Sequence, residues 1–298
     1  MHKAITPSSN GAGARAPRRR SGRALSQISP LLLVGPLLVY MTVFYAVPVV
    51  SMLLRSFNDP SWSLDRYAAL PGDAVFLKIF WNTLSTSFVV TFATLLLAYP
   101  VALALSRARS TAPLIMIVVL LPFWTSVLVR TYAWMVLLGR HGLINEALLA
   151  LGLLERPIQL LNTTIATEIA MTHILLPYMI LPIANRLRQI DPSLARAASG
   201  LGATPFATFL QVIFPLSIPG VAAGVLLVFV LALGFYITPA MVGGSRDITL
   251  SMLIAQEVEL LKWGYAATLS AILLVTGFAL IALAQLLPGV GNTFGVNK

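Results

Sequence analysis

Long apolar stretches separated by short polar segments dominate the hydrophobic pattern of this chain of 298 residues. Six of them are long enough to cross about 30 Å of hydrocarbon, which requires roughly 20 helical residues. They lack the apolar–polar alternation of tilted barrel strands. The pattern therefore predicts an all-α membrane protein with six transmembrane helices. The predicted spans are Leu31–Leu54, Thr83–Leu105, Pro113–Leu138, Leu161–Leu187, Ala207–Tyr236 and Ala266–Leu287.

The composition supports a membrane location and narrows the possible chemistry. The chain is 58% hydrophobic and 10% charged, whereas an ordinary soluble domain carries about 25% charged residues. It contains no cysteine, which excludes disulfides, thiolate metal sites and thiol nucleophiles. We expect membrane lipid around the chain, and no cofactor or metal site. The sequence also shows no phosphate-binding loop, so we expect no ATP site in this chain.

The net charge of +10 is best interpreted as a topology signal. Its densest cluster, Arg15 to Arg23, directly precedes the first apolar stretch, and Arg107 and Arg109 lie in a short turn after the second. Cytoplasmic segments carry the excess of Lys and Arg, so we expect the N-terminus to be cytoplasmic in a bacterial inner membrane. This placement makes nucleic acid an unexpected partner. We expect a disordered basic tail at 1–27, a transmembrane domain at 28–290 and a short C-terminal tail at 291–298.

The segment between the fourth and fifth predicted spans carries strong helix-boundary signals. Asp191 is suited to cap a helix, and Pro192 suits its first position. Gly200 or Gly202 is suited to end that helix in a left-handed conformation. The sequence predicts one short cytoplasmic helix within a loop at 190–205. Taken alone, it is either a docking surface that exposes Ala195, Ala197 and Ala198 or a simple capped connector.

The residues that follow this helix favour docking. Residues 203–220 read Ala-Thr-Pro-Phe-Ala-Thr-Phe-Leu-Gln-Val-Ile-Phe-Pro-Leu-Ser-Ile-Pro-Gly. With the preceding helix, they resemble the EAA loop of binding-protein-dependent ATP-binding-cassette importers. Three more stretches, at residues 121–134, 173–182 and 233–244, extend the resemblance to most of residues 31–287, and it is close to the spermidine/putrescine-type permeases. Arg196 stands where the motif usually has glutamate.

The resemblance implies a type I importer permease fold without enzymatic activity of its own. It implies two cytoplasmic ATPase subunits, a second permease that is a different chain, and a periplasmic solute-binding protein. In that family this loop is the coupling helix, which sits in a groove of the ATPase. The residues that it assigns to ATPase coupling are Asp191, Leu194, Ala195, Arg196, Ala197, Ala198, Leu201, Gly202 and Ala203.

Ionisable and aromatic side chains within the spans are candidates for the solute path. Arg130 and Glu168 lie at similar predicted depth, which permits a salt bridge. The alternative is that Arg130 extends to the interface and Glu168 bonds to nearby polar groups. Aromatic residues would suit a polyamine or another organic cation, although interfacial anchoring is the stronger explanation for aromatic residues near span ends. These candidates are Trp124, Tyr132, Trp134, Tyr178, Phe235 and Tyr236.

An ion-coupled secondary transporter is the main alternative function. It would require midplane ionisable groups or broken helices in paired repeats, and no convincing repeat is visible. His173, close to Glu168, has no second ligand set, so we interpret it as a packed polar residue. The outer segment at 243–263 predicts a Gly-Gly turn and an interfacial helix, a candidate docking site for the binding protein.

Overall fold

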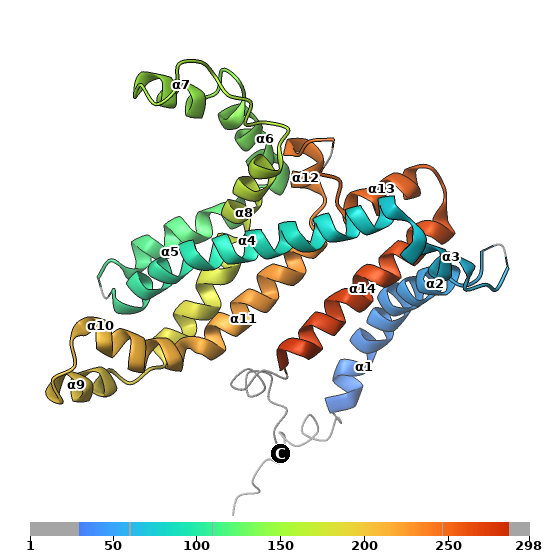
Figure 1. The fold of residues 1–298 in the computed structure, drawn as a ribbon. Coiled ribbons are helices and arrows are strands. Elements are labelled where there is room, and N and C mark those ends of the chain that lie inside the picture. The colour runs from blue at the N-terminus through green and yellow to red at the C-terminus, as the bar shows by residue number, and fades with distance from the viewer. Residues whose placement is uncertain (1–29, 60, 109, 246, 286–298) are drawn as a thin grey trace, which may run out of the picture. The chain divides into compact units, whose positions relative to one another are not determined.

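The computed structural model describes residues 30–59, 61–108, 110–245 and 247–285. All named elements within these ranges are helical, which confirms the predicted all-α class (Figure 1). The chain divides into two units, residues 1–51 and 52–298. The predicted tails lie almost wholly outside the described residues.

The first unit carries the beginning of the chain's first apolar helix. It contains α1 (Pro30–Met41), the π-helical η1 (Thr42–Ala46) and most of α2 (Val47–Arg55). Residues Val34–Arg55 are long and apolar enough to cross a membrane, as the sequence predicted.

Four further continuous helical segments in the described residues are long and apolar enough to cross a membrane. They agree with four predicted spans, although the predicted ends differ from the observed ones by several residues. The largest difference is at the second span, which begins at Ala74 because Asp73 caps the helix through the N–H groups of Val75 and Phe76. Hydropathy did not detect these early turns because they include polar side chains. The four segments are α4 (Ala74–Arg107), α8 (Thr164–Arg188), Pro205–Leu233 and α14 (Trp263–Gln285).

The third predicted span is wrong as one continuous helix. It consists of α5 (Ala112–Leu120), the 3-10 turn η3 (Leu121–Trp124) and α6 (Val127–Leu138). The segments Ala112–Trp124 and Val127–Ala150 are bent by 98° relative to each other. Thr125 is extended, and the Ser126 hydroxyl accepts from the Leu128 N–H at 3.3 Å, so a new helix begins there. Hydropathy cannot detect this break because two polar residues barely change the average over a long apolar window.

The fifth predicted span is also divided by local geometry. It contains α10 (Pro205–Thr208), the π-helical η4 (Phe209–Ile213) and α11 (Phe214–Leu233). The predicted end at Tyr236 is too late, because the helix stops before Gly234. A π-helical turn within an α-helix is uncommon and is often found at functional sites.

Helices α4, α8 and α11 pack against one another and hold the main apolar core of the second unit (Figure 1). Glycines on α11 allow the close approach to α8. A Cβ at Gly220 would lie 2.9 Å from the Pro182 carbonyl oxygen, and one at Gly224 would lie 2.8 Å from the Met179 sulfur. This pair of small residues four positions apart is typical of membrane helix packing.

Hydroxyl groups line part of the buried side of α4. Thr83, Thr91 and Thr94 are buried, and each donates to the carbonyl four residues earlier, at 2.8, 2.7 and 2.6 Å. Thr83 also accepts a hydrogen bond from the backbone N–H of Leu250 at 2.7 Å. The hydroxyl donors are therefore satisfied within their own helix.

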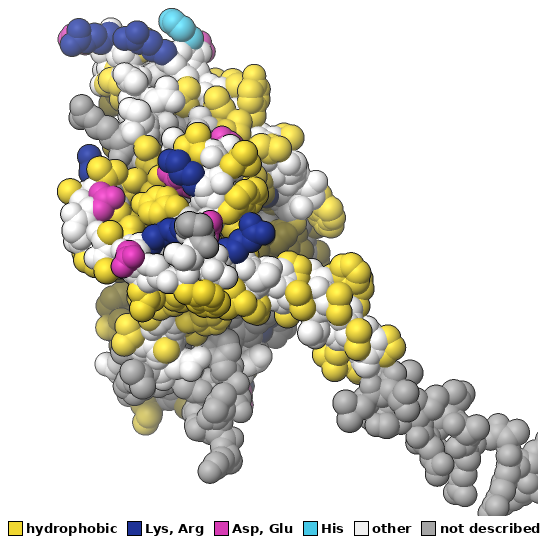
Figure 2. Space-filling view, turned by 90° about the vertical axis from the view of Figure 1, so that its right-hand side faces the viewer, with side chains coloured by type: hydrophobic (Ala, Val, Ile, Leu, Met, Phe, Trp, Pro, Cys, Tyr) yellow, Lys and Arg dark blue, Asp and Glu magenta, His cyan; other side chains and the backbone are white. Residues whose placement is uncertain are grey.

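Shorter helices connect the long ones. The helix predicted within residues 243–263 is present as α13 (Leu250–Glu259), and its interfacial position stays a prediction. Helix α7 (Leu143–Ala150) was not predicted. On the face shown in Figure 2, hydrophobic side chains cover wide areas and charged side chains gather mainly in the upper half of the view. The remaining short elements are α3 (Asp65–Ala69), η2 (Leu70–Gly72), α7 (Leu143–Ala150), α9 (Pro192–Gly200), α12 (Ile237–Val242) and α13 (Leu250–Glu259).

Candidate functional site

The loop between α8 and α11 folds as the sequence predicted. Asp191 caps α9 by accepting the Ser193 N–H at 2.8 Å. That backbone bond, followed by a bond from the Ser193 side chain, lowers the pKa of the Asp191 carboxyl below its ordinary value of 3.8. The cap is therefore ionised at neutral pH, and a carboxylate at a helix N-terminus also interacts favourably with the helix dipole.

Gly202 ends α9, whereas Gly200 lies inside the helix. The backbone of Gly202 has a φ of +88°, a left-handed conformation that residues with a Cβ adopt only at an energetic cost. The Gly202 N–H donates to Ser199 and the Ala203 N–H donates to Ala198, both at 3.0 Å. This pair of bonds is the Schellman arrangement, which satisfies carbonyls at the end of a helix. Both ends of α9 are thus fixed by backbone geometry.

Large apolar side chains, more than the alanines, dominate the exposed surface of this loop. Leu201 is 90% exposed and Phe206 is 73% exposed, with Leu194 at 45%. Ala197 is exposed, whereas Ala195 and Ala198 are half-buried, which differs from the expectation that all three are presented. Exposed apolar groups of this size mark interaction sites when they gather on one surface.

Arg196 is exposed on the same helix. Within the described residues, its guanidinium forms no ion pair. The ion pair found there joins Lys262 and Glu257 at 3.3 Å. The charge at the position usually occupied by glutamate is therefore available to another protein.

A second site is a cavity of about 420 Å³ between α4, α6 and α8. It brings together two predicted solute-path residues, Glu168 and Trp134. The Trp134 indole donates to His173 Nδ1 at 3.2 Å, so His173 is a hydrogen-bonded polar residue at the cavity wall. Its lining residues are Val89, Ala93, Leu97, Trp134, Ile165, Glu168, Ile169, Thr172, His173 and Leu176.

Among the described residues, Arg130 and Glu168 do not form an ion pair, which was one of the two alternatives that the sequence left open. Arg130 lies within electrostatic reach of Tyr178 and His173, and its buried Nε has no hydrogen-bond partner among the described residues. Glu168 instead lies near Asp247. Equal depth in the membrane does not make two side chains face each other, because it leaves their directions around the helix axes undetermined.

The other aromatic candidates are dispersed. Trp124 and Tyr132 are 80% and 62% exposed, and Tyr236 is 41% exposed. Phe235 packs against the main core, and Tyr178 contacts Phe123 with ring centroids 5.0 Å apart. None of these five residues lines the cavity that contains Glu168.

Asp247 is a polar connector that the sequence analysis missed. Its carboxylate accepts from the Thr164 hydroxyl at 2.5 Å and from the Gly244 N–H at 3.1 Å. These bonds join the Gly-Gly turn to the start of α8, one turn before Glu168. An acid three residues after a Gly-Gly pair is a signal that could have indicated this turn.

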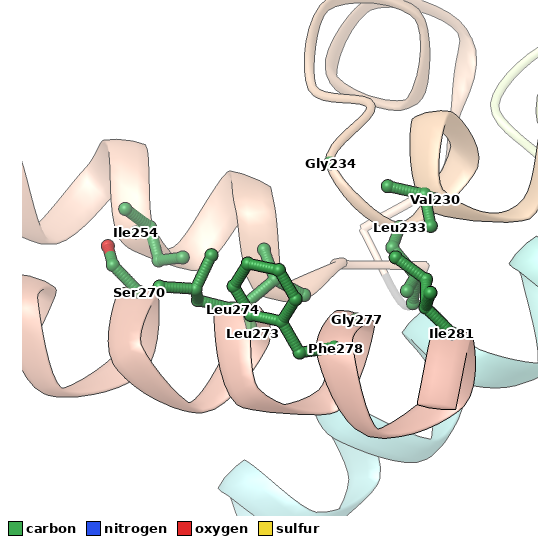
Figure 3. Close-up of a pocket in the computed structure, with 10 residues that line it drawn as sticks. All are labelled: Val230, Leu233, Gly234, Ile254, Ser270, Leu273, Leu274, Gly277, Phe278 and Ile281. Carbon is green, nitrogen blue, oxygen red and sulfur yellow. The ribbon is translucent and has the colours of Figure 1, made fainter. Parts of the chain in front are cut away.

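An apolar pocket of about 300 Å³ lies between α11, α13 and α14 (Figure 3). Ser270 is the one polar side chain among the described residues that line it, and its hydroxyl donates to the Ala266 carbonyl at 2.8 Å. The pocket therefore has no free polar side chain for a hydrophilic solute.

Comparison with known proteins identifies the family. The family model described as the binding-protein-dependent transport system inner membrane component matches residues 24–287. The chain belongs to this family. The permease is also 35% identical over 229 residues to the spermidine/putrescine transport system permease protein PotB of Haemophilus influenzae, covering 76% of this chain and 75% of that protein.

Two further similarities agree with this assignment. The inner membrane ABC transporter permease protein YdcU of Escherichia coli is 34% identical over 249 residues, covering 76% of the permease and 79% of that protein. A chain from the crystal structure of a bacterial ABC transporter that imports the acidic polysaccharide alginate matches with a TM-score of 0.69 and 16% identity. It covers 85% of the permease and 92% of that chain, and the likeness shows a shared fold.

The permease is a multi-pass inner-membrane component of an ATP-binding-cassette importer. ATP hydrolysis resides in a separate subunit in this family, and a periplasmic binding protein delivers the solute. The permease is therefore not itself the ATPase. An ion-coupled secondary transporter, the alternative function, is excluded by this membership.

Proposed function

We propose that the permease moves a polyamine or a related organic cation. The similarity to PotB supports this substrate class. The cavity between α4, α6 and α8 supports it independently, because it combines the half-buried Glu168 carboxylate with the Trp134 ring. A carboxylate inside a membrane protein is costly unless it meets a positive partner, and an aromatic face attracts ammonium groups.

Within this proposal, Glu168 and Trp134 are solute contacts. Arg130 lies within electrostatic reach of His173 at the cavity wall, and Tyr178 lies within reach of Arg130. The remaining aromatic candidates do not line the cavity: Trp124, Tyr132, Phe235 and Tyr236. The cavity is open, and several of its apolar lining residues are exposed. A second permease subunit, a different chain by family resemblance, would close it and complete the path.

We further propose that α9 docks into a groove of one of the two cytoplasmic ATPase subunits, with the N-terminus on the same side of the membrane. The observation that carries this proposal is a helix capped at both ends that exposes Leu201 and Phe206 beside it. Burial of such side chains against a partner contributes about 1.5–3 kcal/mol each. The capped backbone keeps these groups in a fixed arrangement.

The substrate test is uptake of radiolabelled spermidine into proteoliposomes that contain the permease, its ATPase, the second permease and the binding protein. Uptake should require ATP, and Glu168→Gln should lower it about tenfold, equivalent to about 1.4 kcal/mol of lost transition-state or binding stabilisation. Glu155→Gln, at an exposed acid outside both the cavity and the segment at 243–263, is the matched control. Normal spermidine uptake by Glu168→Gln would remove Glu168 from the path, and absence of uptake by the native complex would refute the polyamine assignment.

The docking test is co-purification of the ATPase with the permease. Leu201→Ser and Phe206→Ser should each weaken the association, whereas Leu151→Ser, at an equally exposed leucine of another loop, should not. Unchanged ATPase association in both loop variants would contradict docking through this surface.

A further inference from the structure

A single tyrosine of α4 contacts both ends of the π-helical turn that follows the coupling loop. The Tyr99 ring lies 5.8 Å from the Phe209 ring, edge to face, and 5.9 Å from the Phe214 ring. Phe209 begins η4 and Phe214 directly follows it, and the Phe214 N–H donates to the Phe209 carbonyl. Aromatic contacts at these distances and angles are favourable.

The Tyr99 hydroxyl adds a directional bond to this contact. It lies 2.9 Å from the hydroxyl of Ser217, a fully buried residue of α11. The Ser217 hydroxyl donates its one hydrogen to the Phe214 carbonyl at 2.7 Å. Because a serine hydroxyl has a single donor, Tyr99 must be the donor to Ser217. A chain of two hydrogen bonds therefore joins α4 to the backbone just after η4.

The π-helical turn is a weak point in the helix that contains it. Its hydrogen bonds span five residues, an arrangement that is rare in proteins and occurs mostly as single turns inside α-helices. In addition, Pro215 and Pro219 lack backbone N–H donors in the turns that follow. The Thr208 hydroxyl, just before η4, is buried without a hydrogen-bond partner among the described residues. A displacement of α9 and α10 is therefore most easily absorbed here unless another element supports the turn.

We propose that Tyr99 is a positioning residue that transmits movement of the coupling loop to α4. Through its contacts with Phe209, Phe214 and Ser217, Tyr99 keeps the helix from bending at η4. As a result, α10, η4 and the start of α11 move together with α4. The consequence reaches the cavity, since Leu97, Ala93 and Val89 of α4 line its wall. This inference rests on the proposed docking of α9 to the ATPase, and it assigns the route by which that docking changes the solute cavity.

The test uses the absence of native cysteine in this chain, which permits a single label in the purified permease before the importer is assembled. Ser199→Cys on α9 and Ser85→Cys on α4 are both exposed sites for an environment-sensitive fluorophore. The assembled importer is compared without nucleotide and with ATP plus vanadate. In the native complex, we expect both labels to respond. In Tyr99→Ala, the α9 label should respond normally, and the α4 response should fall at least about fivefold.

Conservative variants separate the ring from the hydroxyl. Tyr99→Phe and Ser217→Ala keep the rings and remove the hydroxyl bond, so a loss in these variants assigns transmission to the hydrogen-bond chain. Retention in them with loss in Tyr99→Ala assigns it to the ring contacts, and either result supports the proposal. The control is Tyr67→Phe, which removes another tyrosine–serine pair, the 2.7 Å bond from Tyr67 to Ser56. It should leave both signals unchanged.

A native α4 response in Tyr99→Ala, or an equal loss in Tyr67→Phe, would overturn the role of Tyr99 and leave the docking of α9 intact. A silent α9 label in the native complex would overturn docking and transmission together. Thermal unfolding of each variant accompanies these measurements, and a folded Tyr99→Ala complex with an α9 response confirms that lost folding does not explain the result.

Discussion

Gly202 controls the end of α9 because its φ of +88° excludes most side chains. A left-handed backbone costs other residues about 1–2 kcal/mol. We expect Gly202→Asp to remain inserted in the membrane but to lose uptake, because the loop no longer presents α9 to the ATPase in one geometry. ATP-dependent uptake and ATPase co-purification measure this.

Gly200 is the matched control for this substitution. It lies in the regular part of α9, and a Cβ there would meet nothing within 4 Å. Gly200→Ala should therefore be tolerated and should favour the helix. Normal uptake and normal coupling in Gly202→Asp would show that the loop conformation does not matter.

Asp191 gives the loop a defined response to pH. Its lowered pKa means that the cap stabilises α9 fully above the ordinary value of 3.8 and loses this effect as the pH falls through the lower folded value. Small changes of pH near neutrality should therefore not alter ATPase association through the protonation of Asp191. Asp191→Asn should retain association because asparagine also caps helices, whereas Asp191→Ala should weaken it. Equal association of all three proteins in a pull-down would exclude a role for the cap.

At this scale, sequence reasoning succeeded where the signal was local. Asp191, Pro192 and Gly202 predicted the two ends of α9 because capping depends on near neighbours in the chain. It did not predict the surroundings of Arg130, Glu168 and Asp247, because these depend on how separate helices are rotated about their axes.

Among the elements, α11 and α8 depend on small residues for their close contact. Gly224→Val should destabilise the permease by about 1–3 kcal/mol, since the added atoms would overlap Met179 and wedge the helices apart. Thermal unfolding in detergent or nanodiscs measures the loss. Gly277→Val is the control, because a Cβ at Gly277 would meet nothing within 4 Å. Equal stability of the two variants would argue against close packing at Gly224.

The long helices were predictable because about 20 apolar residues leave little alternative in a membrane. The break between α5 and α6 was not, since apolar residues flank it on both sides and only Thr125 and Ser126 interrupt them after the 3-10 turn at Leu121–Trp124. The π-helical η4 was likewise invisible to hydropathy, although Pro215 indicated an interruption nearby.

For the whole molecule, the proposed topology has a direct test. Ser199→Cys in α9 should react with a membrane-impermeant maleimide only after the inner membrane is permeabilised. Ser61→Cys, an exposed residue between α2 and α3, should react in intact spheroplasts. The charge distribution predicts this result, because the basic tail and the turn at Arg107 favour the cytoplasm. The reverse labelling pattern would place α9 in the periplasm and refute coupling through it.

The hydroxyl seam of α4 has a mechanical consequence. Thr91 and Thr94 already satisfy their donors within α4, so neighbouring helices can slide past that stretch without breaking hydrogen bonds in a medium that offers no water to replace them. Thr83, by contrast, accepts a hydrogen bond from the Leu250 N–H and so ties the N-terminal part of α4 to α13. Helix α4 is thus held by a hydrogen bond near one end, and at Thr91 and Thr94 it can shift against its neighbours without losing one. This arrangement suits small displacements repeated over many transport cycles.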